Sequence, residues 1–187
     1  MRVTPADIPE VLLIEPVVSR DPRGYFLETY HAERYQQCGI AGTFVQDNHS
    51  RSAQHTVRGL HLQLTRPQAK LIRVVRGEIF DVAVDVRRGS PTFGKWVGVT
   101  LSAESFWQYY IPEGFAHGFS VLSAGAEIEY KCTNVYDPQG QLGIRWNDPS
   151  LAIPWRVDEP ILSDRDRTNP TLREVEHLLP RYSPTKP

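Results

Sequence analysis

The feature that most constrains the fold of this chain is a long series of short segments rich in β-branched and aromatic residues. Clusters of Gly, Pro, Asp, Ser and Arg separate the segments and supply turn signals. Short strands that alternate with turns roughly every 8–12 residues indicate a β-sandwich or a β-barrel. The strand-like segments are residues 11–18, 24–30, 43–49, 56–63, 70–75, 78–86, 95–102, 106–111, 117–122 and 126–136.

Helical patterns are confined to the margins of this series. Residues 31–39, with Gly39 as a C-terminal cap, and residues 171–179 are the two segments with a helical pattern. The chain has 187 residues, which suits one domain, and neither a linker nor an internal repeat divides it. The sequence therefore predicts a single all-β domain over residues 1–187, with short peripheral helices and a loose tail over about 180–187.

Charge and composition exclude several classes of function. The 21 Lys and Arg residues balance 22 Asp and Glu residues, which argues against nucleic acid as the main partner. No run of about 18 apolar residues is present, and the N-terminus is unlike a signal peptide, so we expect no membrane span. Cys38 and Cys132 are not in a CxxC pattern and indicate free thiols in a reducing compartment, here the cytoplasm.

Lysine is scarce in this chain, with four lysines among 21 basic residues, so a lysine inside an apolar strand needs a reason. Side chains alternate between the two faces of a strand. Lys70 therefore shares a face with Ile72 and Val74. Tyr130 shares a face with Ile128 in the same way. A few polar groups on apolar walls are typical of a small-ligand site, although alternation does not decide which face is the interior.

Three side chains suited to proton transfer next to a carbonyl group occur on these segments. His61 has an imidazole that titrates near neutral pH and suits a general base. Lys70 would place a cation near the oxygen on which negative charge develops, and the phenol of Tyr130 would donate a proton to the carbon. Each also has a structural interpretation: a hydrogen-bonded wall histidine, a strand-end lysine that reaches solvent, and a core tyrosine.

The segment IPEGFAHGF, residues 111–119, has a P-x-G-x-x-H spacing that resembles the second conserved motif of the cupin barrels. In cupins this turn sets a histidine, here His117, at the start of an inward strand and often on a metal. The first cupin motif would need H-x-H and a nearby carboxylate, but His61 is followed by Leu62 and Gln63. Two histidines and an amide are a poor donor set for a first-row metal, so we expect no metal site.

Arginines and amides supply the remaining polar groups near these candidates. A guanidinium group binds phosphate in a bidentate manner, although most exposed arginines are only solvated. The polar block at 46–50 is either the decoration of a sheet edge or a set of hydrogen-bonding groups for a polar ligand. Gly59 allows a bulge that would change the facing of Arg58 relative to His61. The arginines around these segments are Arg23, Arg58, Arg73 and Arg76.

Several nucleotide and hydrolase motifs are missing from the sequence. Neither a Walker loop nor GxGxxG nor GxSxG is present. Nucleotide hydrolysis, Rossmann cofactors and serine hydrolysis therefore have no support.

Long sequence segments follow one another in a specific order from about residue 8 to residue 170. They are FVQDNHSRS (44–52), VRGLHLQ (57–63), KLIRVVRGEIFDVAVDVRRGSPTFGKWVGV (70–99), LSAE (101–104), IPEGFAHGFSVLS (111–123), EYKCT (129–133), IRWNDP (144–149) and ILSDRD (161–166). Through these segments the chain resembles the dTDP-4-dehydrorhamnose 3,5-epimerase family. It departs from the family pattern at Leu62, Ala69, Gln141 and Arg165, where members often have Tyr, Gly, Glu and Lys.

The resemblance implies a fold and an activity. Family members are homodimers with a cupin-like jelly-roll barrel, and they need no cofactor. Their substrate is dTDP-4-dehydro-6-deoxy-D-glucose, in which they invert C3 and C5, the two carbons next to the C4 ketone. The implied partners are therefore the dTDP-sugar and a second copy of the chain, with N-terminal strands exchanged between the subunits.

The resemblance also implies the site. His61 is the proton acceptor with Asp166 as its carboxylate partner, Lys70 stabilises the enolate, and Tyr130 is the proton donor. The implied substrate-binding positions are His117 and Lys70 at the sugar, and Arg23, Glu28, Gln46, Asp47, Asn48 and Arg58 at the nucleotide and diphosphate, with Gln141 and Arg165 at the border of the nucleotide.

Three other functions compete with double epimerisation. The first is a single-position epimerase or a ketoisomerase of a related dTDP-sugar, because the sequence does not separate these enzymes. The others are a non-catalytic barrel that binds sugar nucleotides and a metal-dependent cupin oxygenase. The presence of His61, Lys70, Tyr130 and Asp166 counts against the binding barrel, and the incomplete cupin motif counts against the oxygenase.

Overall fold

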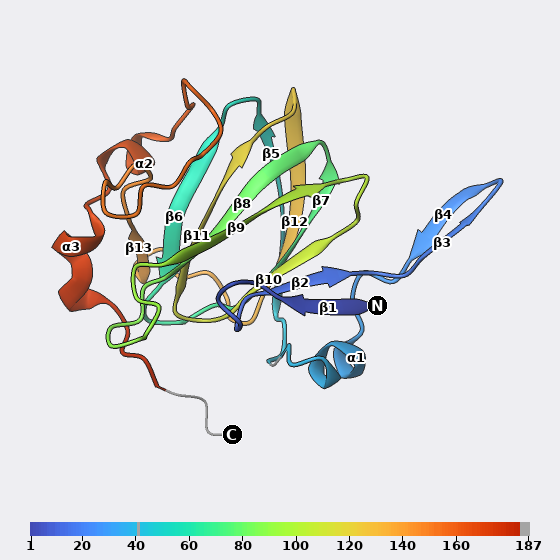
Figure 1. Cartoon of the computed structure of the whole chain (residues 1–187), viewed down its shortest axis with the longest axis horizontal. Coiled ribbons are helices and arrows are strands. Elements are labelled where there is room, and N and C mark those ends of the chain that lie inside the picture. Colours follow the sequence, from blue (N-terminus) through green and yellow to red (C-terminus); the bar gives the residue numbers. More distant parts are fainter. Residues whose placement is uncertain (41, 184–187) are drawn as a thin grey trace.

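The computed structural model describes residues 1–40 and 42–183, which form two antiparallel sheets and a separate two-stranded hairpin (Figure 1). The six-stranded sheet has the order β1-β2-β10-β7-β12-β5, the five-stranded sheet has the order β13-β6-β11-β8-β9, and β3 and β4 form the hairpin. The strands are β1 Arg2–Pro5, β2 Leu12–Glu15, β3 Val18–Asp21, β4 Gly24–Leu27, β5 Gln46–Ala53, β6 Val57–Gln63, β7 Lys70–Arg76, β8 Glu78–Asp85, β9 Trp96–Ser102, β10 Gln108–Ile111, β11 Phe115–Val121, β12 Gly125–Cys132 and β13 Gln141–Gly143. The helices are α1 Ala32–Gln37, α2 Asp164–Thr168, α3 Leu172–Val175 and the 3-10 turn Glu176–Leu178. The all-β prediction is confirmed.

Apolar side chains from both sheets form one core between them. Val74 and Ile128 of the six-stranded sheet pack there with Ile79 and Phe119 of the five-stranded sheet. Burying such side chains is the main favourable contribution to folding, at about 1.5–3 kcal/mol for each large apolar residue. The two sheets are therefore held face to face, and any polar group on an inner face lies in the interior of the barrel.

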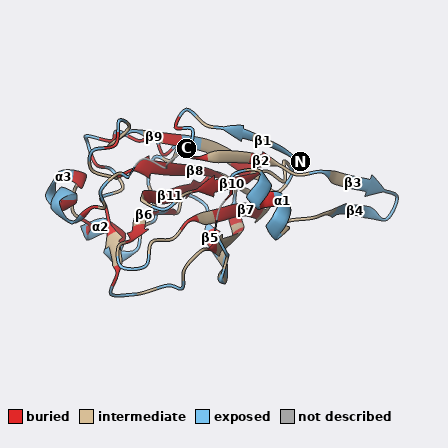
Figure 2. Ribbon diagram, turned by 90° about the horizontal axis from the view of Figure 1, so that it is seen from below, coloured by how far each residue is buried: buried red, intermediate tan, exposed pale blue. Residues whose placement is uncertain are grey.

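β8 is buried on both of its faces, as Figure 2 shows. Ile79 and Ala83 belong to the core between the sheets. Phe80 and Val82 point the other way, into a second core that the C-terminal segment covers with Trp155 and other apolar residues. The two faces of this strand therefore pack into different cores, as the alternation of side chains along a strand requires.

Lys70 and Tyr130 lie on the interior faces of their strands. Ile72, two residues after Lys70, and Ile128, two residues before Tyr130, both belong to the core between the sheets. Tyr130 itself packs against that core and is partly buried. The apolar face that alternation assigns to both polar residues is therefore the interior of the barrel.

Gly59 brings β6 into close contact with β11. A Cβ atom at this position would lie 2.6 Å from the Cα atom of Gly118, and the φ angle of Gly59 is +119°, which favours glycine. The β6–β11 register shifts at this point, between His117 and Phe119. As a result, Arg58 and His61, which strict alternation would place on opposite faces, line the same cavity. The predicted irregularity at Gly59 is confirmed.

Several element boundaries differ from the sequence prediction. The strand predicted at 11–18 divides into β2 and β3 around Pro16, which has no amide hydrogen to donate to a strand ladder. β5 begins at Gln46 rather than at residue 43, and β12 ends at Cys132 rather than at residue 136. The helix predicted at 171–179 is a short α3 followed by a 3-10 turn. The short elements β1, β13 and α2 carry too few residues for a periodic pattern, and the sequence did not predict them.

The C-terminal segment runs back along the five-stranded sheet. Ile161 forms a parallel bridge with Thr56, and its carbonyl accepts a hydrogen bond from the Val57 amide at 3.0 Å. Farther on, the Tyr182 amide donates to the carbonyl of Arg88 at 2.9 Å. The last part of the loose tail predicted over 180–187 lies outside the described residues. No helix within the described ranges is both long and apolar enough to cross a bilayer.

Candidate active site

A cavity of about 510 Å³ opens between the two sheets and carries the candidate catalytic groups. A smaller cavity of about 250 Å³ adjoins it and shares four lining residues with it: His61, Lys70, Tyr130 and Gln141. His61 comes from the five-stranded sheet, whereas Lys70 and Tyr130 come from the six-stranded sheet. The fold therefore brings together three side chains that lie on three different strands.

His61 is held by a buried carboxylate from α2. Its Nε2 atom lies 2.6 Å from Oδ1 of Asp166, whose side chain is only 4% exposed. The Ser163 hydroxyl caps α2 by accepting a bond from the Asp166 amide at 3.1 Å, and Asn169 donates to Oδ1 at 3.3 Å. Burial opposes ionisation of Asp166, but the hydrogen bond from His61 holds the pKa of this carboxyl below its ordinary value. An ionised Asp166 accepts the Nε2 proton and leaves Nδ1 as the basic nitrogen.

Lys70 is the end of a second chain of polar contacts inside the barrel. Its Nζ atom lies 3.5 Å from Nδ1 of His117, and Nε2 of His117 donates to both carboxylate oxygens of Asp81, at 3.0 and 3.1 Å. Burial lowers the pKa of His117, so this imidazole is neutral and accepts from Lys70 through Nδ1. Burial also lowers the pKa of Lys70.

Tyr130 faces the cavity as a neutral phenol. Burial raises the pKa of its hydroxyl, so the proton stays on the oxygen at neutral pH. Its neighbours across the ladder are Asn48 on β5 and Ile72 on β7. A protonated phenol on the wall opposite the His61 strand is placed to act as a proton donor.

Polar groups surround this centre along the walls of both cavities. Arg58 lines the larger cavity, and its Nε donates to the Ser52 hydroxyl at 2.9 Å. Gln46 and Asn48 line the smaller cavity and are joined by a hydrogen bond of 2.9 Å. At the rim, Arg165 donates to the side-chain and main-chain oxygens of Gln141 at 2.9 and 3.0 Å.

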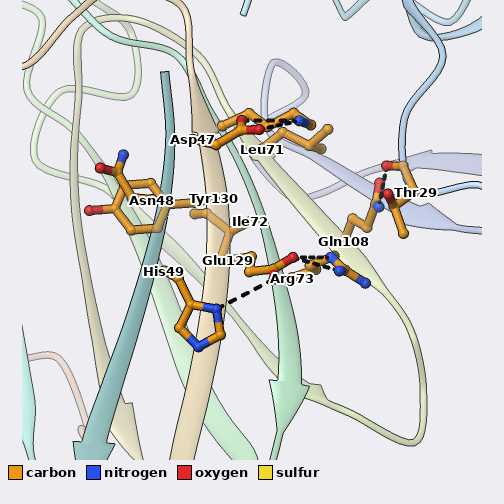
Figure 3. Close-up of a pocket in the computed structure, with 11 residues that line it drawn as sticks. Thr29, Asp47, Asn48, His49, Leu71, Ile72, Arg73, Gln108, Glu129 and Tyr130 are labelled. Atoms are coloured by element: carbon orange, nitrogen blue, oxygen red, sulfur yellow. Dashed lines mark hydrogen bonds and ion pairs between the residues drawn. The ribbon is translucent and has the colours of Figure 1, made fainter. Parts of the chain in front are cut away.

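Three residues that the resemblance places at the nucleotide lie outside these cavities in the single chain. Asp47 lies on the outer face of the six-stranded sheet and forms an ion pair with Lys131 at 2.9 Å (Figure 3). Arg23 is at the tip of the β3–β4 hairpin, which projects from the body in Figure 1, and its side chain is 90% exposed. Glu28 follows the hairpin and pairs with Arg34.

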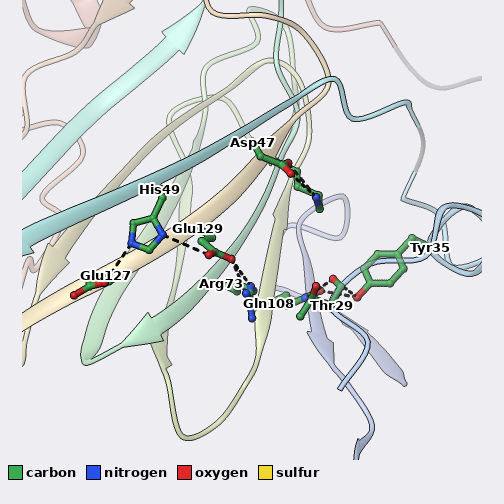
Figure 4. A network of polar contacts seen from close by, with 9 residues as sticks. Thr29, Tyr35, Asp47, His49, Arg73, Gln108, Glu127 and Glu129 are labelled. Atoms are coloured by element: carbon green, nitrogen blue, oxygen red, sulfur yellow. Dashed lines mark hydrogen bonds and ion pairs between the residues drawn. The ribbon is translucent and has the colours of Figure 1, made fainter. Parts of the chain in front are cut away.

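The outer face of the six-stranded sheet carries a separate polar network. His49 lies between two glutamates, at 3.3 Å from Glu127 and 3.4 Å from Glu129 (Figure 4). Arg73 pairs with Glu129 on the same face, and Arg76 is exposed beside Glu127. Of the four arginines that the sequence groups around His61 and Lys70, only Arg58 lines the larger cavity.

Two groups of the site were not among the candidates from the sequence. Asp81 is fully buried on β8 and holds His117. Glu78 and Asp85 lie on the same strand, so a carboxylate there did not by itself single out Asp81. Tyr136 lines the smaller cavity and donates from its hydroxyl to Gln141 at 2.7 Å, while its amide donates to Gln46. It follows β12 in an irregular segment, where alternation gives no orientation.

The histidines of the cavity are bound to carboxylates rather than to one another. Within residues 1–40 and 42–183, no group of three or more His, Cys, Asp or Glu side chains is arranged to hold a metal ion. A base paired with a carboxylate, a partly buried ammonium group and a neutral phenol are together suited to moving protons next to a carbonyl group. Fold and site are those of a cupin-like acid–base isomerase.

Comparison with known proteins gives the particular family. The sequence model of the dTDP-4-dehydrorhamnose 3,5-epimerase family matches residues 5–174. The dTDP-4-dehydrorhamnose 3,5-epimerase of Shigella flexneri is 53% identical over 96% of this chain and 100% of its own length. A crystal structure of the Legionella pneumophila dTDP-6-deoxy-D-glucose-3,5-epimerase, in complex with dTDP-4-keto-L-rhamnose, matches with a TM-score of 0.95 and 49% identity over 97% of this chain and 98% of that one. This chain belongs to the dTDP-4-dehydrorhamnose 3,5-epimerase family.

A relative of different specificity is also similar. The Streptomyces niveus protein named dTDP-4-dehydrorhamnose 3-epimerase is 41% identical over 98% of this chain and 90% of its own length. The relatives of this chain therefore include proteins named for one inversion and proteins named for two.

Proposed function

We propose that this chain inverts C3 and C5 of dTDP-4-dehydro-6-deoxy-D-glucose and so forms dTDP-4-dehydro-L-rhamnose. The observation that carries the proposal is the shared cavity of His61, Lys70 and Tyr130, with His61 bound to Asp166. The ketone at C4 acidifies the hydrogens on both neighbouring carbons, so the protein needs to supply only a base, an acid and a positive group at the oxygen.

Each role follows from the position of a side chain. His61 removes the hydrogen next to the ketone, and Asp166 stabilises the imidazolium that forms. Lys70 stabilises the enolate oxygen, with one of its hydrogens directed to the neutral His117. Tyr130 then protonates the carbon. Because His61 and Tyr130 belong to opposing sheets, a sugar ring between them meets the base on one face and the acid on the other. This arrangement leads to inversion.

Remote parts of the substrate would hold the ring in this position. We propose that Arg58 and Arg165 bind the diphosphate and the adjoining nucleotide, together with the amides of Gln46, Asn48 and Gln141. A guanidinium group forms short charge-assisted hydrogen bonds to phosphate oxygens. Binding energy from these contacts orients the reacting carbons toward His61 and Tyr130.

We expect deuterium to enter the product at both C3 and C5 when dTDP-4-dehydro-6-deoxy-D-glucose is incubated with the protein in D2O. Proton NMR of the sugar, followed over time, measures the two exchanges separately. Exchange at C3 alone would make this chain a 3-epimerase, like the named Streptomyces niveus relative. The absence of exchange at either carbon would contradict any epimerase function.

We further propose that two copies of the chain form a dimer through the β3–β4 hairpin. The hairpin extends away from the body of its own chain (Figure 1), and its Tyr25 and Phe26 are 58% and 74% exposed. Large exposed aromatic residues on a projecting arm are typical of a contact surface. Docked on a second copy, the arm would bring Arg23 and Glu28 to the nucleotide end of that copy's cavity, which accounts for their distance from the cavity of their own chain.

A variant of the arm tests this arrangement. We expect Phe26→Asp to convert the dimer to monomers, measured by size-exclusion chromatography with light scattering. Leu178→Asp, at another exposed apolar residue on the 3-10 turn, is the matched control and should stay dimeric. Arg23→Ala should keep the dimer but weaken dTDP binding by about tenfold, the cost of a lost hydrogen bond to a charged group. A monomeric wild-type protein would rule the arrangement out.

The two thiols support a cytoplasmic location, which is also part of the proposal. Cys38 and Cys132 form no disulfide, and Cys132 is buried in the wall of the smaller cavity. Free thiols persist in the reducing environment of the cytoplasm.

A further inference from the structure

Gln63 presents an unpaired hydrogen-bond acceptor to the smaller cavity. Its side chain lines that cavity, the residue is only 8% exposed, and its Oε1 atom is buried without a hydrogen-bond partner among the described residues. A buried polar atom without a partner is costly, and such atoms are rare in folded proteins. An apolar residue of the same size would avoid this cost, so the amide at this position needs a function.

The position of Gln63 relates it to the reacting groups. It lies two residues after His61 on β6, and Leu62 between them packs into the outer core under the C-terminal segment. His61 and Gln63 therefore face the cavity side by side, separated along the strand by roughly 6.6 Å, the rise of two residues. This spacing is close to the width of a hexose ring, and Lys70 and Tyr130 line the same cavity.

The chemistry of the unpaired atom restricts its partner. A carbonyl oxygen accepts a hydrogen bond and does not bind phosphate oxygens, which are also acceptors. In the proposed substrate, hydroxyl groups are the donors nearest to the reacting carbons. The hydroxyl at C2 keeps its configuration throughout the reaction, whereas the hydroxyl at C3 changes position when that carbon is inverted. A fixed acceptor is thus suited to the C2 hydroxyl.

We propose that Gln63 is a sugar-positioning residue whose Oε1 atom accepts a hydrogen bond from the C2 hydroxyl of the nucleotide sugar. This inference rests on the proposed epimerase function. The contact fixes the rotation of the ring in the cavity, so that the carbons next to the ketone meet His61 on one side and Tyr130 on the other. Gln63 thereby adds selectivity for the sugar.

The test replaces the amide with an apolar side chain of similar size. We expect Gln63→Met to lower kcat/KM for the nucleotide sugar about two- to twelvefold, the range for one lost neutral hydrogen bond. Binding of dTDP alone, measured by calorimetry, should be unchanged, and the melting temperature should be equal to or above that of the wild type because a buried unpaired acceptor is removed. Gln139→Met, at an exposed glutamine, is the control.

A substrate analogue tests the same contact without relying on the variant. The wild-type protein should process the 2-deoxy analogue about two- to twelvefold less efficiently, and Gln63→Met should show no further loss with it. Three results would each overturn the inference. They are an unchanged kcat/KM in Gln63→Met, a loss of dTDP binding in this variant as large as its loss of kcat/KM, and full efficiency of the wild type with the analogue. These outcomes leave deuterium exchange by the wild type intact, whereas failure of the proposed function would remove that exchange.

Discussion

His61→Ala should lower proton exchange at both C3 and C5 by a factor of about 10²–10⁴, the usual contribution of a general base. Both exchanges should fall together, because one imidazole faces the cavity with Asp166 behind it. Binding of dTDP should remain near the wild-type value, since Arg58 and the amides of the walls are unchanged. Exchange is followed by NMR in D2O, and dTDP binding by calorimetry.

Two comparison variants sharpen this experiment. His49→Ala removes a histidine from the outer face of the six-stranded sheet and should leave exchange unchanged. Tyr130→Phe should slow formation of inverted product more than removal of the proton, so recovered substrate should carry deuterium. If His61→Ala retains more than about a tenth of the exchange rate, another residue is the base.

Lys70→Met should lower kcat by a factor of about 10²–10³, equivalent to about 2.7–4 kcal/mol of lost stabilisation of the enolate. The ammonium group is held near the cavity by His117 and Asp81, so no reorganisation is needed when negative charge develops on the ketone oxygen. Lys95→Met, at an exposed lysine, is the matched control. Steady-state kinetics measures the effect, and a kcat within about threefold of the wild type would exclude this role.

The pH dependence provides a second readout of the same residue. Burial lowers the pKa of Lys70 below the ordinary value for lysine, which is about 10.4. In the proposed mechanism the protonated form of Lys70 is the active one, so activity should decline as pH rises through this lowered pKa. The decline should begin below the pH at which a free lysine loses its proton. In the Lys70→Arg variant, any remaining activity should decline only at higher pH, because a guanidinium group stays protonated in the pH range in which Lys70 loses its proton.

Local patterns in the sequence predicted much of the fold because turn residues mark the ends of strands and alternation along a strand separates its two faces. Alternation placed Lys70 and Tyr130 on the apolar faces that prove to be interior. Their meeting with His61 in one cavity depends on how two sheets pack, which periodicity does not contain. Asp81 illustrates the limit: it is one of three carboxylates on β8, and only its bond to His117, across the ladder between β8 and β11, distinguishes it.

Other parts of the site required the resemblance or the structure. Asp166 lies in a five-residue helix, too short for a helical pattern, and only its likeness to family members pointed to it. Neighbouring residues of the polar block at 46–50 separate onto two faces: Gln46 and Asn48 line the cavity, whereas Asp47 pairs with Lys131 outside. Arg23 and Glu28 lie apart from the cavity because the hairpin leaves the body of the chain, an arrangement that no local pattern specifies.

The position of Asp166 in the C-terminal segment has a consequence for the synthesis of the protein. Among the described residues, every strand of both sheets lies before residue 144, whereas the carboxylate bound to His61 comes 105 residues after His61 itself. A nascent chain on the ribosome therefore contains all the strands of the barrel before it contains both His61 and Asp166. In the proposed mechanism, the His61–Asp166 pair of each chain is therefore completed only after the polypeptide beyond the final strand has emerged and folded back onto the sheet.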